Sequence, residues 1–426
     1  MRHLGRLLAS LLALSTMGSG GAAADPRCES DNAGLKLPEG FCAWVFADTG
    51  NGPRHITVSR QGVLYANLAG LIDGKSILAL ADTDGDGRAD QRGLFGNWAG
   101  NSIALHDGYL YASRNNQIVR FPIEPGALQP SGPEEVVVEG FPQQRGHRAK
   151  TFAIDPAKNE IYVNVGAPSN ACQRQARTPG SPGLDPCPQR DRQASVWRFR
   201  TDRLHQQQIE HGLKYASGTR NLIAIAWNSQ TKGLYAVQHG RDQLHDLWPV
   251  LFTKEQSAEL PAEEFLRIEE GDDFGWPYCY YDPMKQQRVL APEYGGDGKV
   301  VGRCAQYTDP ILAFPAHYAP NGLVFYHAEQ FPPRYRNGAF VAFHGSWNRR
   351  PFEQQGFLVA FVPFADGKPS GGWEVFADGF AGERFISHPS EADHRPMGLA
   401  VGPDGTLYVG DDKGGRIWQI LYTGNR

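Results

Sequence analysis

The chain of 426 residues is long enough for two or three ordinary domains, or for one large all-β domain built from repeats. It is 41% hydrophobic, with 22 Phe, 16 Tyr and 9 Trp for a sizeable core, and its 50 Gly and 30 Pro are typical of many tight turns between short strands. The formal net charge is −4 and no Lys/Arg run stands out, so nucleic acid and anionic membranes are not expected partners.

The N-terminus has the parts of a secretory signal. Arg2 and Arg6 precede an apolar segment over 7–14, and small residues follow at 22–24. The apolar run is too short for a membrane span, which needs roughly 20 apolar residues. We therefore predict a signal peptide over 1–24 and a periplasmic or secreted protein with 40 basic and 46 acidic residues, a net charge of −6. A retained N-terminal anchor is the alternative.

Six cysteines behind an export signal indicate disulfides. Because they cluster along the chain, we expect bridges between sequential neighbours, although other pairings are possible: Cys28–Cys42, Cys172–Cys187 and Cys279–Cys304. No C-x-x-C and no C-x-x-C-H occurs, so neither a zinc knuckle nor a covalently attached haem is expected.

One short pattern, a turn residue followed by an apolar-aromatic strand, recurs along the chain. Six copies begin at Gln61, Asp107, Lys158, Lys232, Asn337 and Asp404, as in QGVLYAN and DGTLYVG. Most copies follow an upstream partner strand such as RHITVS or PMGLAVG, so each pair is expected to form a hairpin. Hairpins of one type across the whole chain predict an all-β, six-bladed β-propeller, whose sheets bury both faces and leave only short edges. A pair of β-sandwiches is the alternative.

We expect a single propeller domain over 25–426 with two long loop insertions. The first, at about 167–192, is rich in Pro, Gly and Cys. The second, at about 249–302, is dense in turns, contains a cysteine and includes a candidate short helix near 253–264. Long insertions in a compact fold are more often functional or cross-linked than idle, and we expect both to rise over one face.

An acidic segment, DTDGDGRAD at 82–90, resembles a calcium-binding loop. Carboxylates alternate at Asp82, Asp84 and Asp86, with a glycine at the sixth position, as the ligands and the turn of such a loop require. The twelfth position is Gly93 rather than the bidentate Glu of an EF-hand, and no helix is expected on either side. A solvated turn between strands is the alternative to a structural Ca²⁺ site.

Polar residues also stand at the ends of predicted strands, where loops place functional groups on a rigid scaffold. In the stretch 218–242, GTRNLIAIAWNSQTKGLYAVQHGRD, two short apolar strands are framed by Arg220-Asn221 and by His239-Gly240-Arg241-Asp242. His147 precedes the strand KTFAID, and a histidine in that position is suited to act as a general base. A hairpin with a solvated tip and a loop histidine without function are the alternatives.

Arginines stand at further strand ends. Arg349 and Arg350 follow HGSWN, and Arg395 lies in HRP. In a propeller these positions converge on the central channel, and because arginine binds carboxylates in bidentate geometry, convergence predicts a polyanionic ligand. Unrelated surface charge is the alternative.

The chain resembles the glucose/sorbosone dehydrogenases, soluble pyrroloquinoline quinone (PQQ) enzymes built on a six-bladed propeller, and among them the L-sorbosone dehydrogenase-like proteins. The resemblance rests on a series of motifs in order, from LPEGF at 37–41 through RNLIAIAW, EGDDFGWPYCYYD, APNGLVFY and HGSWNR to HRPMGLAVGPDGTLYVGDD. It implies a PQQ- and Ca²⁺-dependent oxidoreductase acting on an aldose or a sugar aldehyde. Electrons would pass to an external acceptor, a cytochrome or a quinone, since the chain has no haem motif of its own.

The resemblance implies roles for the polar strand ends. His147 falls on the catalytic histidine, which takes the proton of the sugar hydroxyl while a hydride passes to the quinone. The backbone carbonyls of Gly240 and Arg241 fall where the family holds its active-site Ca²⁺, a Lewis acid toward a quinone carbonyl. The cofactor contacts fall on Arg220, Asn221, Arg349 and Arg395.

Several positions depart from the family pattern. Arg241 stands where the soluble glucose enzymes have Pro, and Met397 stands where they have a second cofactor arginine. The cofactor lysine falls near Asn348 or Arg349, and Thr151 replaces a basic residue after the catalytic histidine. The losses at Met397 and Asn348 favour the alternative of a non-catalytic propeller that kept the scaffold as a binding module, whereas the retained His147, Arg220, Asn221 and Arg395 favour the enzyme. A metal-dependent lactonase-like hydrolase is a third possibility, but its cluster of buried carboxylates is not evident.

Overall fold

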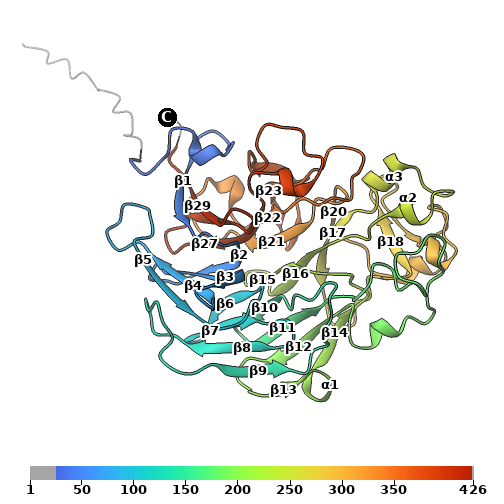
Figure 1. Cartoon of the computed structure of the whole chain (residues 1–426), viewed down its shortest axis with the longest axis horizontal. Helices are drawn as coiled ribbons and strands as arrows, with labels where there is room; N and C mark the ends of the chain where they lie inside the picture. Colours follow the sequence, from blue (N-terminus) through green and yellow to red (C-terminus); the bar gives the residue numbers. More distant parts are fainter. Residues whose placement is uncertain (1–24, 425–426) are drawn as a thin grey trace, which may run out of the picture.

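A computed structural model describes residues 25–424 of the chain (Figure 1). The signal peptide predicted over 1–24 lies outside the described residues. Within them, no helix is both long enough and apolar enough to cross a membrane.

Six sheets of four or five strands form the blades of a β-propeller, which confirms the predicted fold class. Blade 1 contains β2 (Pro53–Val58), β3 (Leu64–Ile72), β4 (Lys75–Ala81) and β5 (Gln91–Phe95). Blade 2 contains β6 (Ile103–His106), β7 (Tyr109–Ser113), β8 (Ile118–Pro122) and β9 (Glu135–Glu139), with β13 (Gln206–Gln207) added parallel to β9. Blade 3 contains β10 (Phe152–Asp155), β11 (Glu160–Val165), β12 (Ser195–Arg200) and β14 (Leu213–Ser217).

The second half of the chain forms three further blades. Blade 4 contains β15 (Ala224–Asn228), β16 (Gly233–Gln238), β17 (Glu263–Ile268) and β20 (Leu312–Phe314). Blade 5 contains β21 (Pro320–Phe325), β22 (Ala339–Phe343), β23 (Leu358–Val362) and β26 (Glu374–Ala377). Blade 6 contains β27 (Pro396–Val401), β28 (Leu407–Asp411), β29 (Arg416–Tyr422) and β1 (Phe41–Asp48).

The first strands of the six blades form a ring around the central channel. In order, β2, β6, β10, β15, β21 and β27 each contact the next, and β27 contacts β2 again. The six copies of the sequence pattern all fall on the second strands: β3, β7, β11, β16, β22 and β28. The recurring hairpin is therefore the inner half of each blade, and apolar clusters fill the space between neighbouring blades.

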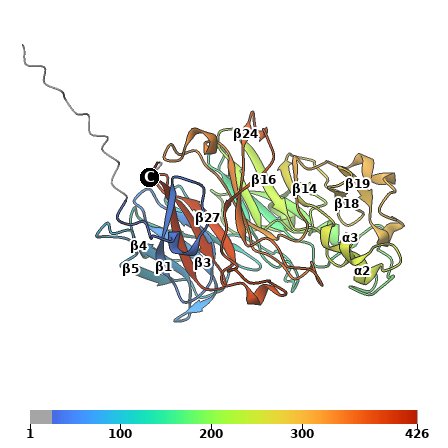
Figure 2. The ribbon, with the colours of Figure 1, turned by 90° about the horizontal axis from the view of Figure 1, so that it is seen from above.

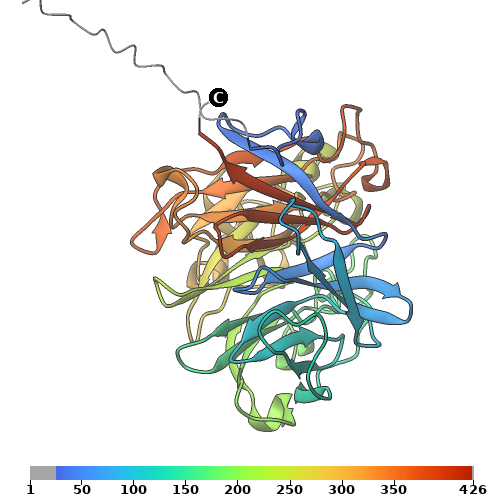
Figure 3. The same ribbon diagram turned by 90° about the vertical axis from the view of Figure 1, so that its left-hand side faces the viewer.

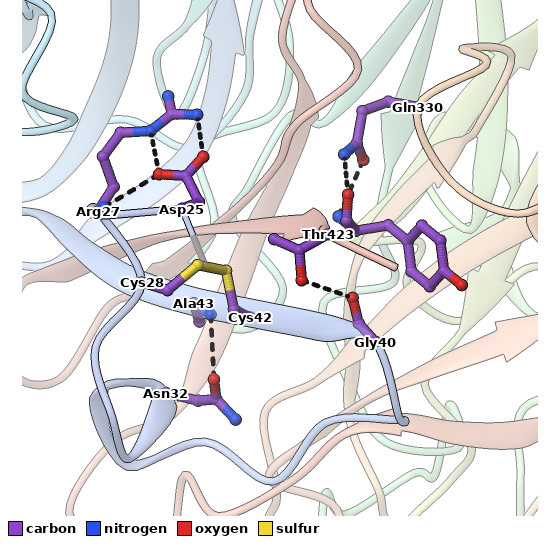
Figure 4. Close-up of a disulfide and its surroundings, with 10 residues drawn as sticks. Asp25, Arg27, Cys28, Asn32, Gly40, Cys42, Ala43, Gln330 and Thr423 are labelled. Atoms are coloured by element: carbon purple, nitrogen blue, oxygen red, sulfur yellow. Dashed lines mark hydrogen bonds and ion pairs between the residues drawn. A yellow bond between two sulfur atoms is a disulfide. The ribbon is translucent and has the colours of Figure 1, made fainter. Parts of the chain in front are cut away.

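The two ends of the chain close the propeller by sharing blade 6. Strand β1 pairs antiparallel with β29, so that Phe41 lies opposite Tyr422 (Figure 3). Gly40 reinforces the closure, because its carbonyl accepts hydrogen bonds from Thr423, and the Cys28–Cys42 disulfide ties the preceding segment to β1 (Figure 4). A Cβ at Gly40 would lie 2.5 Å from the Tyr422 ring, so a side chain there would obstruct this junction. Closure pairs β29 on both sides and makes β1 the outer strand of blade 6.

Both long insertions pack together at one end of the molecule (Figure 2). The first is cross-linked by Cys172–Cys187 and the second by Cys279–Cys304, and the four cysteines share one apolar cluster, so all three predicted bridges are confirmed. The second insertion and the residues that flank it contain α2 (Leu244–Leu247), α3 (Lys254–Glu259), β18 (Cys279–Asp282), β19 (Gln287–Leu290), η3 (Pro292–Tyr294) and η4 (Gly302–Gln306). The remaining short elements are η1 (Asn32–Gly34), η2 (Pro188–Asp191), α1 (Gln208–His211), η5 (Pro333–Tyr335), β24 (Phe364–Ala365), β25 (Lys368–Pro369) and η6 (Pro389–Glu391).

The insertion expected at about 249–302 differs from the structure in one respect. Strand β17 of blade 4 lies within it, so the excursion consists of two segments on either side of a core strand. The helix expected near 253–264 spans only Lys254–Glu259, where the side chain of Thr253 caps its first turn. Glu263 and Glu264 instead begin β17 with their side chains buried.

Candidate functional site

A cavity of about 380 Å³ lies at the mouth of the central channel, at the end where the inner strands begin. Its walls come from five of the six blades. The polar residues that line it are Arg54, Asn101, Asn115, Arg145, His147, Arg148, Asn221, His239, Asn321 and His344. None of the lining residues is Asp or Glu. The cavity therefore presents cations, imidazoles and amides to a ligand, which favours an anion.

His147 lies on the loop that enters β10, in a left-handed backbone conformation with φ of 46°. Its Nδ1 lies 2.6 Å from the carbonyl oxygen of Ala167. Because a carbonyl only accepts, Nδ1 carries the proton and Nε2 keeps its lone pair. Burial, together with the charge of Arg220, lowers the pKa of His147 to about 3, so the imidazole is neutral at neutral pH. Gln144 fixes this loop by donating to the carbonyls of Gly146 and His147.

Asn221 faces the cavity, whereas its neighbour Arg220 lies behind the wall. The Oδ1 atom of Asn221 is buried and accepts no hydrogen bond from the described residues. A Cβ at Gly166 would come within 2.8 Å of this atom, so only glycine allows the approach. The guanidinium of Arg220 instead donates to Asp242 Oδ2 at 2.9 Å and to Asn170 Oδ1 at 3.1 Å.

Asp242 is the centre of a buried ionic cluster next to the cavity. It accepts from Arg220, from Arg177 at 2.7 Å and from Asn348 Nδ2 at 2.9 Å. Burial opposes ionisation, but the two guanidinium groups outweigh it and hold the pKa of Asp242 well below its usual range. The charge of Arg220 is thus neutralised by the protein itself.

The turn at Gly240 and Arg241 is held from two sides. The Gly240 N–H donates to Glu263 Oε2 at 2.7 Å, and the buried guanidinium of Arg241 forms an ion pair with Glu293 of the second insertion. Burial raises the pKa of Glu263 to about 8, so this carboxyl is largely neutral at pH 7. Neither carbonyl of the turn accepts a hydrogen bond from the residues described.

The ligands and charges around this turn can be compared with those that Ca²⁺ requires. Two free carbonyl oxygens are ligands of the right kind. The nearby carboxylates are either ion-paired with arginine, as in Asp242 and Glu293, or largely protonated, as in Glu263. The turn therefore fits Ca²⁺ only when a further anionic ligand in the cavity supplies negative charge.

A second ionic cluster forms the opposite wall. Asp412 forms an ion pair with Arg54 and accepts a hydrogen bond from Nε2 of His344, and both of these residues line the cavity. Arg395 donates through Nε to the carbonyl of His344 at 2.9 Å and through Nη2 to the carbonyl of Gly345. Arg395 thus lies directly behind the wall and positions the 344–345 turn.

Arg349 is placed differently from what the resemblance implies. Its buried guanidinium donates to the carbonyl of Ala258 at 2.8 Å and to Glu259 Oε1 at 2.6 Å, at the end of α3. It is not among the residues that line the cavity. Met397 is fully buried in β27, so no basic group replaces the missing arginine there.

The acidic loop at 82–90 lies apart from this cavity, in the turn between β4 and β5. The carboxylate oxygens of Asp82, Asp84 and Asp86 lie within 4.8 Å of one another. Asp82 accepts from the N–H groups of Gly85 and Gly87, as in a turn that needs no ion. The carboxylates are largely exposed, and the second calcium site remains a prediction.

Sequence reasoning missed several lining residues, above all Arg54, Asn101 and Arg145. Arg54 stands at the start of the strand RHITVS, so the rule that singled out Arg220 and Arg395 also applies to it. Asn101 lies two residues before β6 and carries no distinctive signal.

Fold and site together define a six-bladed propeller with a cationic pocket at its axis. A family model described as TrAA12-like matches residues 35–423, and the chain belongs to this family. An uncharacterized protein of Borreliella burgdorferi is 24% identical over 278 residues, covering 65% of this chain and 61% of the relative. A pyrroloquinoline quinone-dependent pyranose dehydrogenase of Coprinopsis cinerea is 25% identical over 263 residues, covering 53% of this chain and 34% of the relative. The chain thus spans less than two thirds of the length of these relatives.

Solved structures show the same fold. The holo form of the pyranose dehydrogenase PQQ domain from Coprinopsis cinerea has a TM-score of 0.72 at 20% identity, covering 93% of this chain and 98% of that one. The calcium structure of a Trichoderma reesei family AA12 protein has a TM-score of 0.74 at 17% identity, covering 91% and 97%.

Proposed function

We propose that this protein is a PQQ-dependent oxidoreductase that oxidises an aldose or a sugar aldehyde. The observation that carries the proposal is the axial cavity, which is lined by three arginines, three histidines and four asparagines and by no carboxylate. PQQ is a flat quinone with three carboxylates, and a cationic pocket of this kind suits it. Family membership and the names of the relatives point to the same cofactor.

The chain's own residues divide into those that face the ligand and those that support the wall. Arg54, Arg148 and Asn221 face the cavity and would hold the carboxylates and ring polar atoms of PQQ. Arg220 and Arg395 act through Asp242 and through the 344–345 turn, and Arg349 acts through α3. When bound, PQQ supplies a two-electron acceptor for the hydride of the sugar.

His147 is the proposed general base. Its Nε2 is free to accept the proton of a sugar hydroxyl, while the Ala167 carbonyl holds the proton on Nδ1 and stabilises the ring once it becomes charged. The carbonyls of Gly240 and Arg241 are the proposed Ca²⁺ ligands. An external cytochrome or quinone takes the electrons, and the three disulfides support a periplasmic or secreted location.

Calorimetric titration of PQQ into the mature protein, with Ca²⁺ and with a chelator, tests the binding step. We expect tight binding that requires Ca²⁺ and that weakens in Arg148→Ala, whose side chain faces the cavity, but not in Arg92→Ala on exposed β5. His147→Gln should keep the affinity and lower sugar-dependent dye reduction about 10²- to 10⁴-fold. Absence of PQQ binding under both conditions would refute the proposal.

A non-catalytic binding propeller is the second candidate. The observation that favours it is that the guanidinium groups of Arg220 and Arg349 are already paired with Asp242 and Glu259. PQQ binding without dye reduction for any of a panel of aldoses and sugar aldehydes would select this alternative.

A further inference from the structure

Lys150 is a buried cation directly behind the cavity wall. It follows Arg148 and Ala149, which line the cavity, and its side chain is 0% exposed. The ammonium donates one hydrogen bond, to the carbonyl of Arg148 at 2.8 Å. Among residues 25–424, no carboxylate lies within ion-pairing distance of it.

The buried arginines among the described residues are paired. Arg220 meets Asp242, Arg241 meets Glu293, and Arg288 meets Glu264. An ammonium has three donors, and a buried charge without a counter-charge is costly. Burial alone lowers the pKa of Lys150 to about 8, and no neighbouring charge contributes to that shift. At pH 7 the side chain is therefore mostly charged, and residues 25–424 provide no anionic partner for it.

A ligand bound in the cavity could supply the anionic partner that Lys150 lacks. The Arg148 carbonyl that accepts from Lys150 belongs to a residue of the cavity wall. The side chains of Arg145 and Arg148 are exposed, so solvent and salt screen their charges. The side chain of Lys150 is 0% exposed, so its charge is screened less than the charges of Arg145 and Arg148.

We propose that Lys150 is the buried counter-charge for one anionic group of a ligand bound in the axial cavity, and that this group is held next to the loop 147–150. The inference rests on the proposed function, because PQQ is the tricarboxylate used to test it. In this role Lys150 is a positioning residue: it attracts and orients the ligand but does not take part in proton transfer.

A purely structural lysine would behave differently. Loss of its hydrogen bond to Arg148 would destabilise the ligand-free protein and leave ligand affinity nearly unchanged. Removing a counter-charge has the opposite effects. The ligand-free protein no longer buries an unpaired ammonium and becomes no less stable, while the affinity for the anionic ligand falls.

The test compares Lys150→Met and Lys150→Gln with Lys158→Met, an exposed lysine at the far end of the same β10–β11 hairpin. The glutamine keeps a donor for the Arg148 carbonyl and removes the charge. The readouts are the Tm of the ligand-free protein and the Kd for PQQ at low and at high ionic strength. We expect an unchanged or higher Tm for both Lys150 variants, and an affinity at least about tenfold weaker at either ionic strength. Lys158→Met should match the wild type.

Each other outcome rejects the inference. If PQQ binds the wild type and Lys150→Gln equally, the counter-charge is rejected while the proposed function stands. If the Tm falls and the affinity does not change, Lys150 is structural. If PQQ does not bind the wild type, the proposed function fails and the inference fails with it.

Discussion

The ionic cluster around Asp242 gives the sharpest prediction about stability. In Asp242→Asn, the buried guanidinium of Arg220, with 4% of its side chain exposed, loses its counter-charge. Removing one partner of a buried ion pair costs about 3–5 kcal/mol because the remaining charge stays desolvated. Arg177 adds little, since its side chain is 42% exposed. The amide still reaches Asn348, so we expect a loss near the lower bound, about 3 kcal/mol of unfolding free energy.

Urea unfolding followed by tryptophan fluorescence measures this loss, and an unchanged slope m would show that the denatured state is unaffected. The double variant Arg220→Met/Asp242→Asn removes both charges together. Its loss of unfolding free energy should therefore be about 2 kcal/mol smaller than the sum of the losses of the two single variants. Additive losses, or a loss below about 1 kcal/mol for Asp242→Asn, would refute the assignment of this cluster as a mutually dependent pair.

Three further predictions follow from the same structure. Burial lowers the pKa of His55 from 6.5 to about 4, so between these pH values the unfolded chain binds one more proton there than the folded chain. The folded state therefore loses stability as the pH is lowered from 6.5 to 4. In His55→Gln this loss should be smaller by about 1.4 kcal/mol per pH unit, measured by urea melts at several pH values. Replacing Cys172 and Cys187 with Ser opens a loop of 15 residues and should cost about 2–4 kcal/mol, whereas an unchanged melting temperature would show that this bridge stabilises little. Asp84→Ala should abolish one Ca²⁺ site in a titration without PQQ if the 82–90 loop binds the ion, and unchanged stoichiometry would reject the loop as a site.

The sequence alone was enough for the features that depend on neighbours along the chain. The turn-plus-strand pattern that begins at Gln61 and at Asp404 defines hairpins whose two strands are adjacent, so six copies predicted six blades. The disulfides join cysteines 14, 15 and 25 residues apart, and sequential pairing was correct for that reason. Strand β17 was missed because its two leading glutamates, Glu263 and Glu264, lack the apolar character expected of a buried strand.

Tertiary structure decided where the charged side chains point. Arg220 and Arg349 stand at strand ends as predicted, but their partners Asp242 and Glu259 both lie in the connection between β16 and β17. A guanidinium pairs with whichever carboxylate the fold brings close to it, and the residues next to it in the sequence do not predict that partner. The sequence by itself determined a disulfide-linked six-bladed scaffold with polar groups at its strand ends. Only the packing of the blades decided which of those groups face the axial cavity, because burial and pairing depend on residues far apart in the chain. The same packing buried Lys150 with no counter-charge from the part of the chain that the structure describes.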